Sequence, residues 1–127
     1  MRPLNLVGGW IGMLAGVLSG AVIGLFFHQE TWMGGYTSYR RRLMRLGHIA
    51  FFGLGFLNIA FSLTSGELLL HGSWFAIASW ALIIAAASMP ACCFLAAWHK
   101  PLRHLFPIPV LSMTTGLLAI LIGGFAR

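Results

Sequence analysis

Apolar residues fall into four long runs that are separated by short polar connections. The runs cover about residues 6–27, 43–63, 73–98 and 107–126. Each is close to the roughly 20 residues that a helix needs to cross a hydrocarbon core about 30 Å thick. Because lipid offers no partners for backbone N–H and C=O groups, each run must be helical. We therefore expect an all-α integral membrane protein with four transmembrane helices.

The connections between the runs are too short to hold a separate domain. They cover residues 28–42, 64–72 and 99–106, and they contain the turn residues Gly34-Gly35, Ser65-Gly66 and Pro101. Short connections make consecutive helices antiparallel neighbours. The pattern predicts one transmembrane domain over residues 1–127, folded as an up-down bundle with both termini on the same side.

Composition supports lipid rather than water as the main solvent. The chain is 59% hydrophobic and 8% charged, whereas a soluble domain has roughly 45–50% apolar and about 25% charged residues. The net charge of +6 comes from residues gathered in the connections. A nucleic-acid-binding protein spreads such residues over a solvated face, so we expect no nucleic-acid partner.

The placement of basic residues predicts the orientation. Six of the eight lie in or beside the first and third connections, which share a side: Arg40, Arg41, Arg42, Arg45, Lys100 and Arg103. Cytoplasmic loops carry the excess of Lys and Arg, so both termini are expected on the non-cytoplasmic side of a bacterial inner membrane. The first run is longer than the apolar part of a cleavable signal peptide and is expected to be retained.

Glycines recur at every fourth position of the first run. They are Gly8, Gly12, Gly16, Gly20 and Gly24. Residues four apart share a helical face, and small residues let helices approach closely in lipid. This face predicts close packing against another helix of the chain, against another membrane subunit or a second copy, or against a flat cofactor.

His48 is the most informative ionisable residue, because it lies inside the second run. Such a side chain at membrane depth usually faces the bundle interior and has a partner. Phe52 and Gly55 follow on the same face, where glycine would leave room for a porphyrin and imidazole could ligate its iron. His48 is therefore a candidate ligand of haem b. A quinone or proton-relay role and a structural histidine are the alternatives.

A bis-histidine iron site needs a second imidazole at similar depth. His99 is the better candidate and His28 the alternative, and both lie at the ends of apolar runs on the same side as His48. Arg45 and its neighbours could hold haem propionates. Four short helices with a histidine near the cytoplasmic face are similar to haem-bearing membrane anchors of respiratory enzymes, an architectural similarity without a shared motif.

The arginine triplet at residues 40–42 has a second interpretation. Arg40, Arg41 and Arg42 could bind anionic lipid headgroups, since basic residues beside a membrane span attract them. They could also serve orientation alone. Zinc spacings are absent from the sequence, and Cys92 and Cys93 are adjacent, which argues against a disulfide between them.

Three functional hypotheses remain open. The leading one is a small subunit of a larger, electron-transfer complex that binds haem b or quinone through His48. The second is a cofactor-free structural or assembly subunit that packs through the glycine face. The third is a small channel or transporter oligomer, for which the runs offer few polar residues. No hydrolase, phosphate-loop or dinucleotide motif suggests an enzyme acting on its own.

Overall fold

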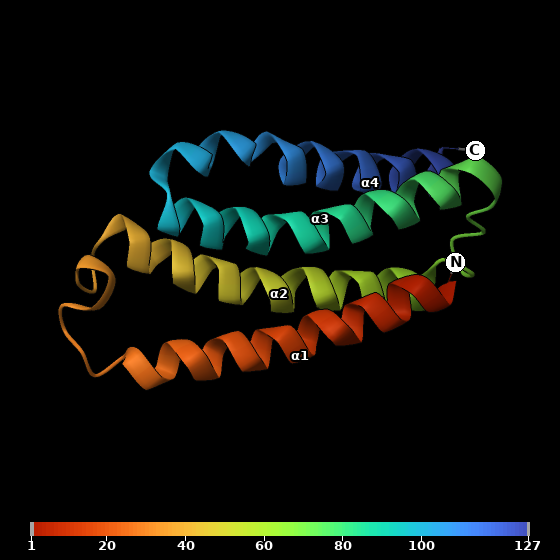
Figure 1. Cartoon of the computed structure of the whole chain (residues 1–127). Coiled ribbons are helices and arrows are strands. Elements are labelled where there is room, and N and C mark those ends of the chain that lie inside the picture. Colours follow the sequence, from red (N-terminus) through yellow and green to blue (C-terminus); the bar gives the residue numbers. More distant parts are fainter. Residues whose placement is uncertain (1, 127) are drawn as a thin grey trace.

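Four long helices account for most of the chain, as the computed structural model in Figure 1 shows. It describes residues 2–126, and of Arg2 the backbone alone. The helices are α1 (Arg2–Phe26), α2 (Tyr39–Thr64), α3 (Gly72–Trp98) and α4 (Pro107–Phe125), with short 3-10 helices η1 (Trp32–Gly34) and η2 (Lys100–Leu105) in the connections. Residues 2–126 contain no strand. The four-helix prediction is confirmed, and each helix is long and apolar enough to cross a membrane.

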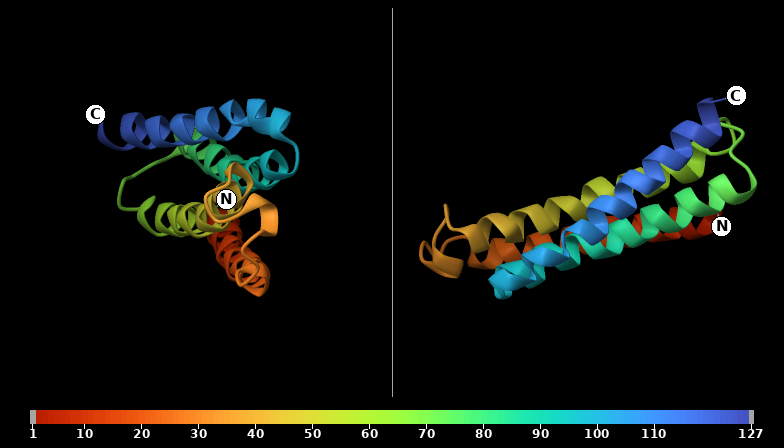
Figure 2. Two further views of the ribbon diagram at one scale, coloured as in Figure 1. Left: turned by 90° about the vertical axis from the view of Figure 1, so that its left-hand side faces the viewer. Right: turned by 90° about the horizontal axis from the view of Figure 1, so that it is seen from above.

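The helices form an open row in chain order rather than a closed ring. α2 packs between α1 and α3, and α4 packs on α3 and η2. A smaller contact joins α1 to α3. α1 and α4 therefore lie at opposite edges, as both figures show (Figures 1 and 2). Each helix runs antiparallel to the next, so the two described ends of the chain lie at the same end of the row (Figure 1).

Helix α2 begins at Tyr39, four residues before the apolar run that predicted it. Ser38 is the N-cap, and its Oγ accepts a hydrogen bond from the Arg41 N–H at 3.1 Å. Such a cap satisfies one of the free donors in the first helical turn. Hydropathy cannot find this start, because the first turn consists of arginines outside the apolar run. α1 likewise begins at Arg2, before its apolar run.

A buried polar network holds three helices together near the chain ends. Asn5, Asn58 and Ser79 are all fully buried. Asn5 Nδ2 donates to Asn58 Oδ1 at 2.7 Å and to the Ser79 carbonyl at 3.2 Å, while Ser79 Oγ donates to Asn5 Oδ1. Asn58 Nδ2 donates to the carbonyls of Leu54 and Leu82. Every amide group is satisfied, so the network fixes the α1–α2–α3 register without exposing polar atoms to lipid.

Small residues bring α3 close to its neighbours. Ala78, Ala85, Ala96 and Ala97 are fully buried. Two apolar clusters result, one around Phe61 and Leu82 near the chain ends and one around Leu43 at the opposite end. The second cluster lies beneath the basic connections and supports them.

Candidate functional site

The ring of His48 lies in a notch on α1. Its Nδ1–H donates to the Gly16 carbonyl at 2.8 Å, and Ser19 Oγ lies 3.3 Å from the same nitrogen. The ring packs against Gly20, where a Cβ atom would collide with it. Phe52 meets the ring edge-on, with centroids 5.3 Å apart. The imidazole thus has polar and apolar partners from its own chain, which compensate its position within an apolar helix.

The glycines that recur every fourth residue on α1 do not all face the same neighbour: some contact α2, one contacts α3 and one contacts no other helix. A Cβ atom on Gly12 would lie 3.3 Å from Gly55 Cα, and one on Gly16 would lie 2.8 Å from the Phe52 ring, both on α2. Gly8 instead faces Ile83 on α3, and nothing lies within 4 Å of a Cβ on Gly24. The middle of this face therefore serves contact with α2 of the same chain.

Gly55 is also in direct contact with α1. A Cβ atom there would lie 2.8 Å from the Gly9 carbonyl oxygen and 3.2 Å from the Met13 nitrogen. Backbone atoms of α1 thus fill the space that the sequence left open for a porphyrin beside Gly55. Close packing of two backbones gains dispersion energy that lipid cannot replace.

The other two candidate iron ligands lie at the ends of their helices. His28 follows α1, His99 is the C-terminal cap of α3, and both are exposed. Gly20 marks the level of His48 on α1, and His28 lies eight residues further on, roughly 12 Å along the axis. Phe94 packs beside Gly47, the neighbour of His48, so His99 lies about 7 Å beyond that level. The structure does not bring either histidine to the depth of His48.

Within residues 2–126, no three His, Cys, Asp or Glu side chains gather closely enough to bind a metal ion. The metal ligands predicted from the sequence are two residues, His48 in α2 and His99 at the C-terminal cap of α3.

Arg41 turns inward and holds the first connection. Only 3% of it is exposed, and its guanidinium donates to the carbonyls of Phe27 at 2.9 Å and Gln29 at 3.2 Å. The same group lies over the rings of Phe27, Trp32 and Tyr36 at 5.2–5.6 Å from their centroids. It gives the Phe27 carbonyl, just after the end of α1, a partner that the backbone does not supply, and it adds a second donor to the Gln29 carbonyl, which also accepts from the Trp32 N–H.

Arg45 holds the same connection from one turn further along α2. Its guanidinium donates to the Tyr36 carbonyl at 3.3 Å and lies 4.2 Å from the centroid of the Tyr36 ring. Arg41 and Arg45 thus have structural partners, whereas the sequence offered them for lipid headgroups and haem propionates respectively.

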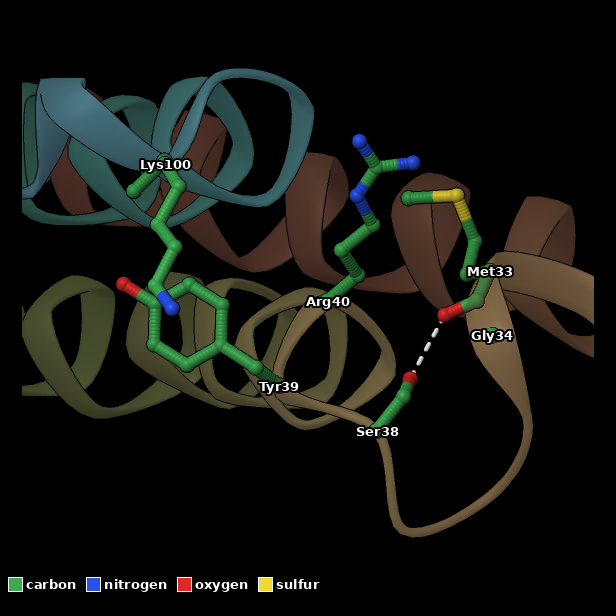
Figure 3. Close-up of a pocket in the computed structure, with 7 residues that line it drawn as sticks. Met33, Gly34, Ser38, Tyr39, Arg40 and Lys100 are labelled. Atoms are coloured by element: carbon green, nitrogen blue, oxygen red, sulfur yellow. Dashed lines mark hydrogen bonds between the residues drawn. The ribbon is translucent and has the colours of Figure 1, made fainter.

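A different pair of basic residues lines an open cavity at this end of the bundle. The cavity has a volume of about 430 Å³. We call it the Arg40–Lys100 cavity, and its lining residues are Met33, Gly34, Ser38, Tyr39, Arg40, Ala96 and Lys100. Figure 3 shows Arg40 between Lys100 and Met33, with Ser38 Oγ donating to the Met33 carbonyl at 2.5 Å. Lys100 Nζ lies 5.5 Å from the centroid of the Tyr39 ring.

Sequence reasoning missed three participants in these sites. Gly9, outside the four-residue glycine repeat, is buried and packs on Gly55 and Ile59. Asn5 lies before the predicted start of the first helix, although its polar side chain beside an apolar run was a usable signal. Lys100 was read as an orientation signal, and only the fold places it beside Arg40.

Comparison with known proteins adds no assignment. No protein-family model, curated protein or solved structure matches the chain at a significant level.

Proposed function

We propose that this chain is a small structural subunit of a larger membrane complex, and that it contributes helix packing rather than a bound cofactor. One observation carries the proposal. His48 and Gly55, the two residues that best suited a haem site, are both in direct contact with α1 of the same chain. The packing of α1 against α2 is therefore sufficient to explain why His48 and Gly55 occur on one face of α2.

The outer surface of the helix row supports association within the membrane. Ile11, Leu14 and Leu18 of α1 are 58–61% exposed, and Leu111 and Leu121 of α4 are similarly exposed. These edge helices offer apolar faces to lipid or to other spans. We further propose a bacterial inner membrane, with the connections at residues 27–38 and 99–106 in the cytoplasm, because six of the eight Lys and Arg residues lie in or just beside them.

Mild-detergent purification of the chain from its native membrane tests this proposal. We expect a colourless preparation in which the chain migrates with other membrane proteins on native gels. His48→Ala should leave that assembly intact and lower only the stability of the chain. A monomeric chain with an activity of its own would contradict the proposal.

A second candidate function retains haem or quinone binding at His48. Its specific support is the Nδ1–H bond to the Gly16 carbonyl. A ligating histidine typically donates its other ring N–H to a carbonyl, which leaves Nε2 with a lone pair for a metal or a quinone. The same purification separates the two candidates. Haem absorbance or bound quinone that disappears in His48→Ala would establish the second candidate and overturn the first.

A further inference from the structure

The basic residues at one end of the bundle fall into two groups. Arg41 and Arg45 donate to carbonyls of the first connection. The Arg40 side chain forms no hydrogen bond or ion pair with any residue from 2 to 126, and the Lys100 ammonium lies over the Tyr39 ring. Both Arg40 and Lys100 are exposed and both line the Arg40–Lys100 cavity. These two cations are therefore available for a ligand.

The fold, rather than the sequence, brings this pair together. Arg40 is in the first turn of α2, and Lys100 is the first residue of η2, which follows α3. Their proximity depends on the packing of the end of α3 against the start of α2, where Leu43 contacts the buried Ala96 and Ala97. Two basic residues line one cavity although 60 positions separate them in the chain.

The electrostatics of the cavity favour an anion. No carboxylate is among its described lining residues, and no ion pair to either cation occurs within residues 2–126. A guanidinium offers a planar fork of donors to a phosphate, and an ammonium adds a compact charge. The N-terminus of α2, which is the positive end of its dipole, also lies at this cavity and adds to the attraction of an anion. Ser38 Oγ is already used by Met33 and Arg41, so recognition rests on the two cations.

The position of the cavity favours a lipid over a small soluble anion. It lies where α2 begins and α3 ends, at one end of four helices of membrane-spanning length. Its lining includes the apolar side chains of Met33 and Ala96 as well as the two cations. A neighbouring cavity of about 230 Å³, lined by Met33, Arg40, Ala97 and Trp98, continues this surface past Arg40. A surface that has cationic groups next to apolar groups matches a lipid, which has an anionic headgroup next to apolar chains.

We propose that Arg40 and Lys100 form a binding site for the phosphate of an anionic phospholipid, with Met33 contacting the adjoining apolar part of that lipid. The site rests on the placement of the chain in a membrane. It is independent of whether the chain is a structural subunit or binds a cofactor. It also differs from the triplet that the sequence suggested, because Arg41 is buried and Lys100 takes its place.

Native mass spectrometry of the detergent-solubilised full chain tests the site. The chain is titrated with dioleoyl phosphatidylglycerol, with dioleoyl phosphatidylcholine and with inorganic phosphate. We expect the first bound phosphatidylglycerol molecule to have at least about tenfold higher affinity than the first phosphatidylcholine molecule. Each basic residue near a membrane surface raises the affinity for an anionic lipid by about fivefold. Arg40→Gln combined with Lys100→Gln should remove that preference.

A charge-matched control separates a site from diffuse attraction. Arg42 and Arg103 are exposed at the same end of the helix row but do not line the Arg40–Lys100 cavity. Arg42→Gln combined with Arg103→Gln should retain the preference to within about threefold. Equal loss in both double variants would overturn the site, and so would equally tight binding of inorganic phosphate. If the Arg40→Gln and Lys100→Gln double variant proves unstable in a thermal melt, Lys100→Gln alone is tested, because Lys100 is exposed in η2. It should lower the preference for phosphatidylglycerol by about fivefold.

Discussion

Three consecutive arginines at the start of α2 have three different environments. Arg40 lines the Arg40–Lys100 cavity, Arg42 is exposed, and Arg41 is buried against the first connection. Successive residues of a helix point about 100° apart, so one of three neighbours must face the bundle. Arg41 is tolerated there because two carbonyls accept hydrogen bonds from its guanidinium and three aromatic rings face its charge. Removing it would leave the Phe27 carbonyl without this partner, whereas the Gln29 carbonyl would still accept from the Trp32 N–H.

Arg41→Ala should lower the free energy of unfolding by about 2–4 kcal/mol, because a buried charged donor is lost together with its aromatic contacts. Arg41→Lys should recover less than half of this loss, since an ammonium cannot reproduce the planar fork. The measurement is unfolding in mixed micelles by added SDS, followed by tryptophan fluorescence. Arg42→Ala is the matched control and should change stability by less than about 0.5 kcal/mol. Equal effects of Arg41→Ala and Arg42→Ala would show that the connection does not depend on Arg41.

Close backbone contact defines the pair of helices α1 and α2. Gly9 and Gly12 on α1 meet Gly55 on α2 with no side chain between them. Further along the pair, Phe52 and His48 extend into the space above Gly16 and Gly20. The two helices thus interlock, with glycine on one side opposite a ring on the other. In lipid the hydrophobic effect does not drive helices together, so van der Waals packing at this close contact stabilises the helix pair instead.

Two glycines of α1 should respond in opposite ways to an added methyl group. A Cβ on Gly9 would lie 2.6 Å from both the Gly55 carbonyl oxygen and Ile59 Cγ1. Gly9→Ala should therefore destabilise the chain by about 1–3 kcal/mol, because the backbone of α2 would have to move. Gly24→Ala meets nothing within 4 Å, so it should be neutral or stabilising by up to about 1 kcal/mol.

The same SDS titration checks both glycine variants. A cost at Gly24 equal to that at Gly9 would mean that the glycines act through backbone flexibility rather than through contact with α2.

The whole molecule is asymmetric in charge along its length. The basic cluster lies at the end formed by the connections 27–38 and 99–106, whereas residues 65–71 and the described chain ends lie at the other (Figure 1). The open row leaves large apolar surfaces on α1 and α4. Such a shape fits a bilayer, in which apolar surface carries no penalty and charge concentrates at the cytoplasmic face.

Site-specific labelling should reveal this sidedness. Thr37, Arg103 and Glu67 are exposed in the connections, and each is replaced singly by cysteine after Cys92→Ala and Cys93→Ala. A membrane-impermeant maleimide should label positions 37 and 103 in inside-out vesicles, and position 67 in intact spheroplasts. Labelling of positions 37 and 103 from opposite sides would contradict the arrangement of all four helices.

The sequence by itself determined the number and type of the elements, because crossing a bilayer demands about 20 apolar residues in a helical backbone. Short connections then made consecutive helices antiparallel. The sequence also shows which residues in the apolar runs are polar but not what they bond to: Asn58 bonds to Asn5 and to the Leu82 carbonyl on two other helices.

Only the tertiary structure decided which groups meet. It set Gly55 against the backbone of α1, turned Arg41 inward and placed Lys100 beside Arg40. Each outcome depends on the rotation and register of one helix against another. In lipid these are fixed by the fit of side chains at the contact and not by the apolar pattern, since every face of such a helix is apolar. Helix positions are therefore local properties of this sequence, whereas its candidate sites are properties of the packed row.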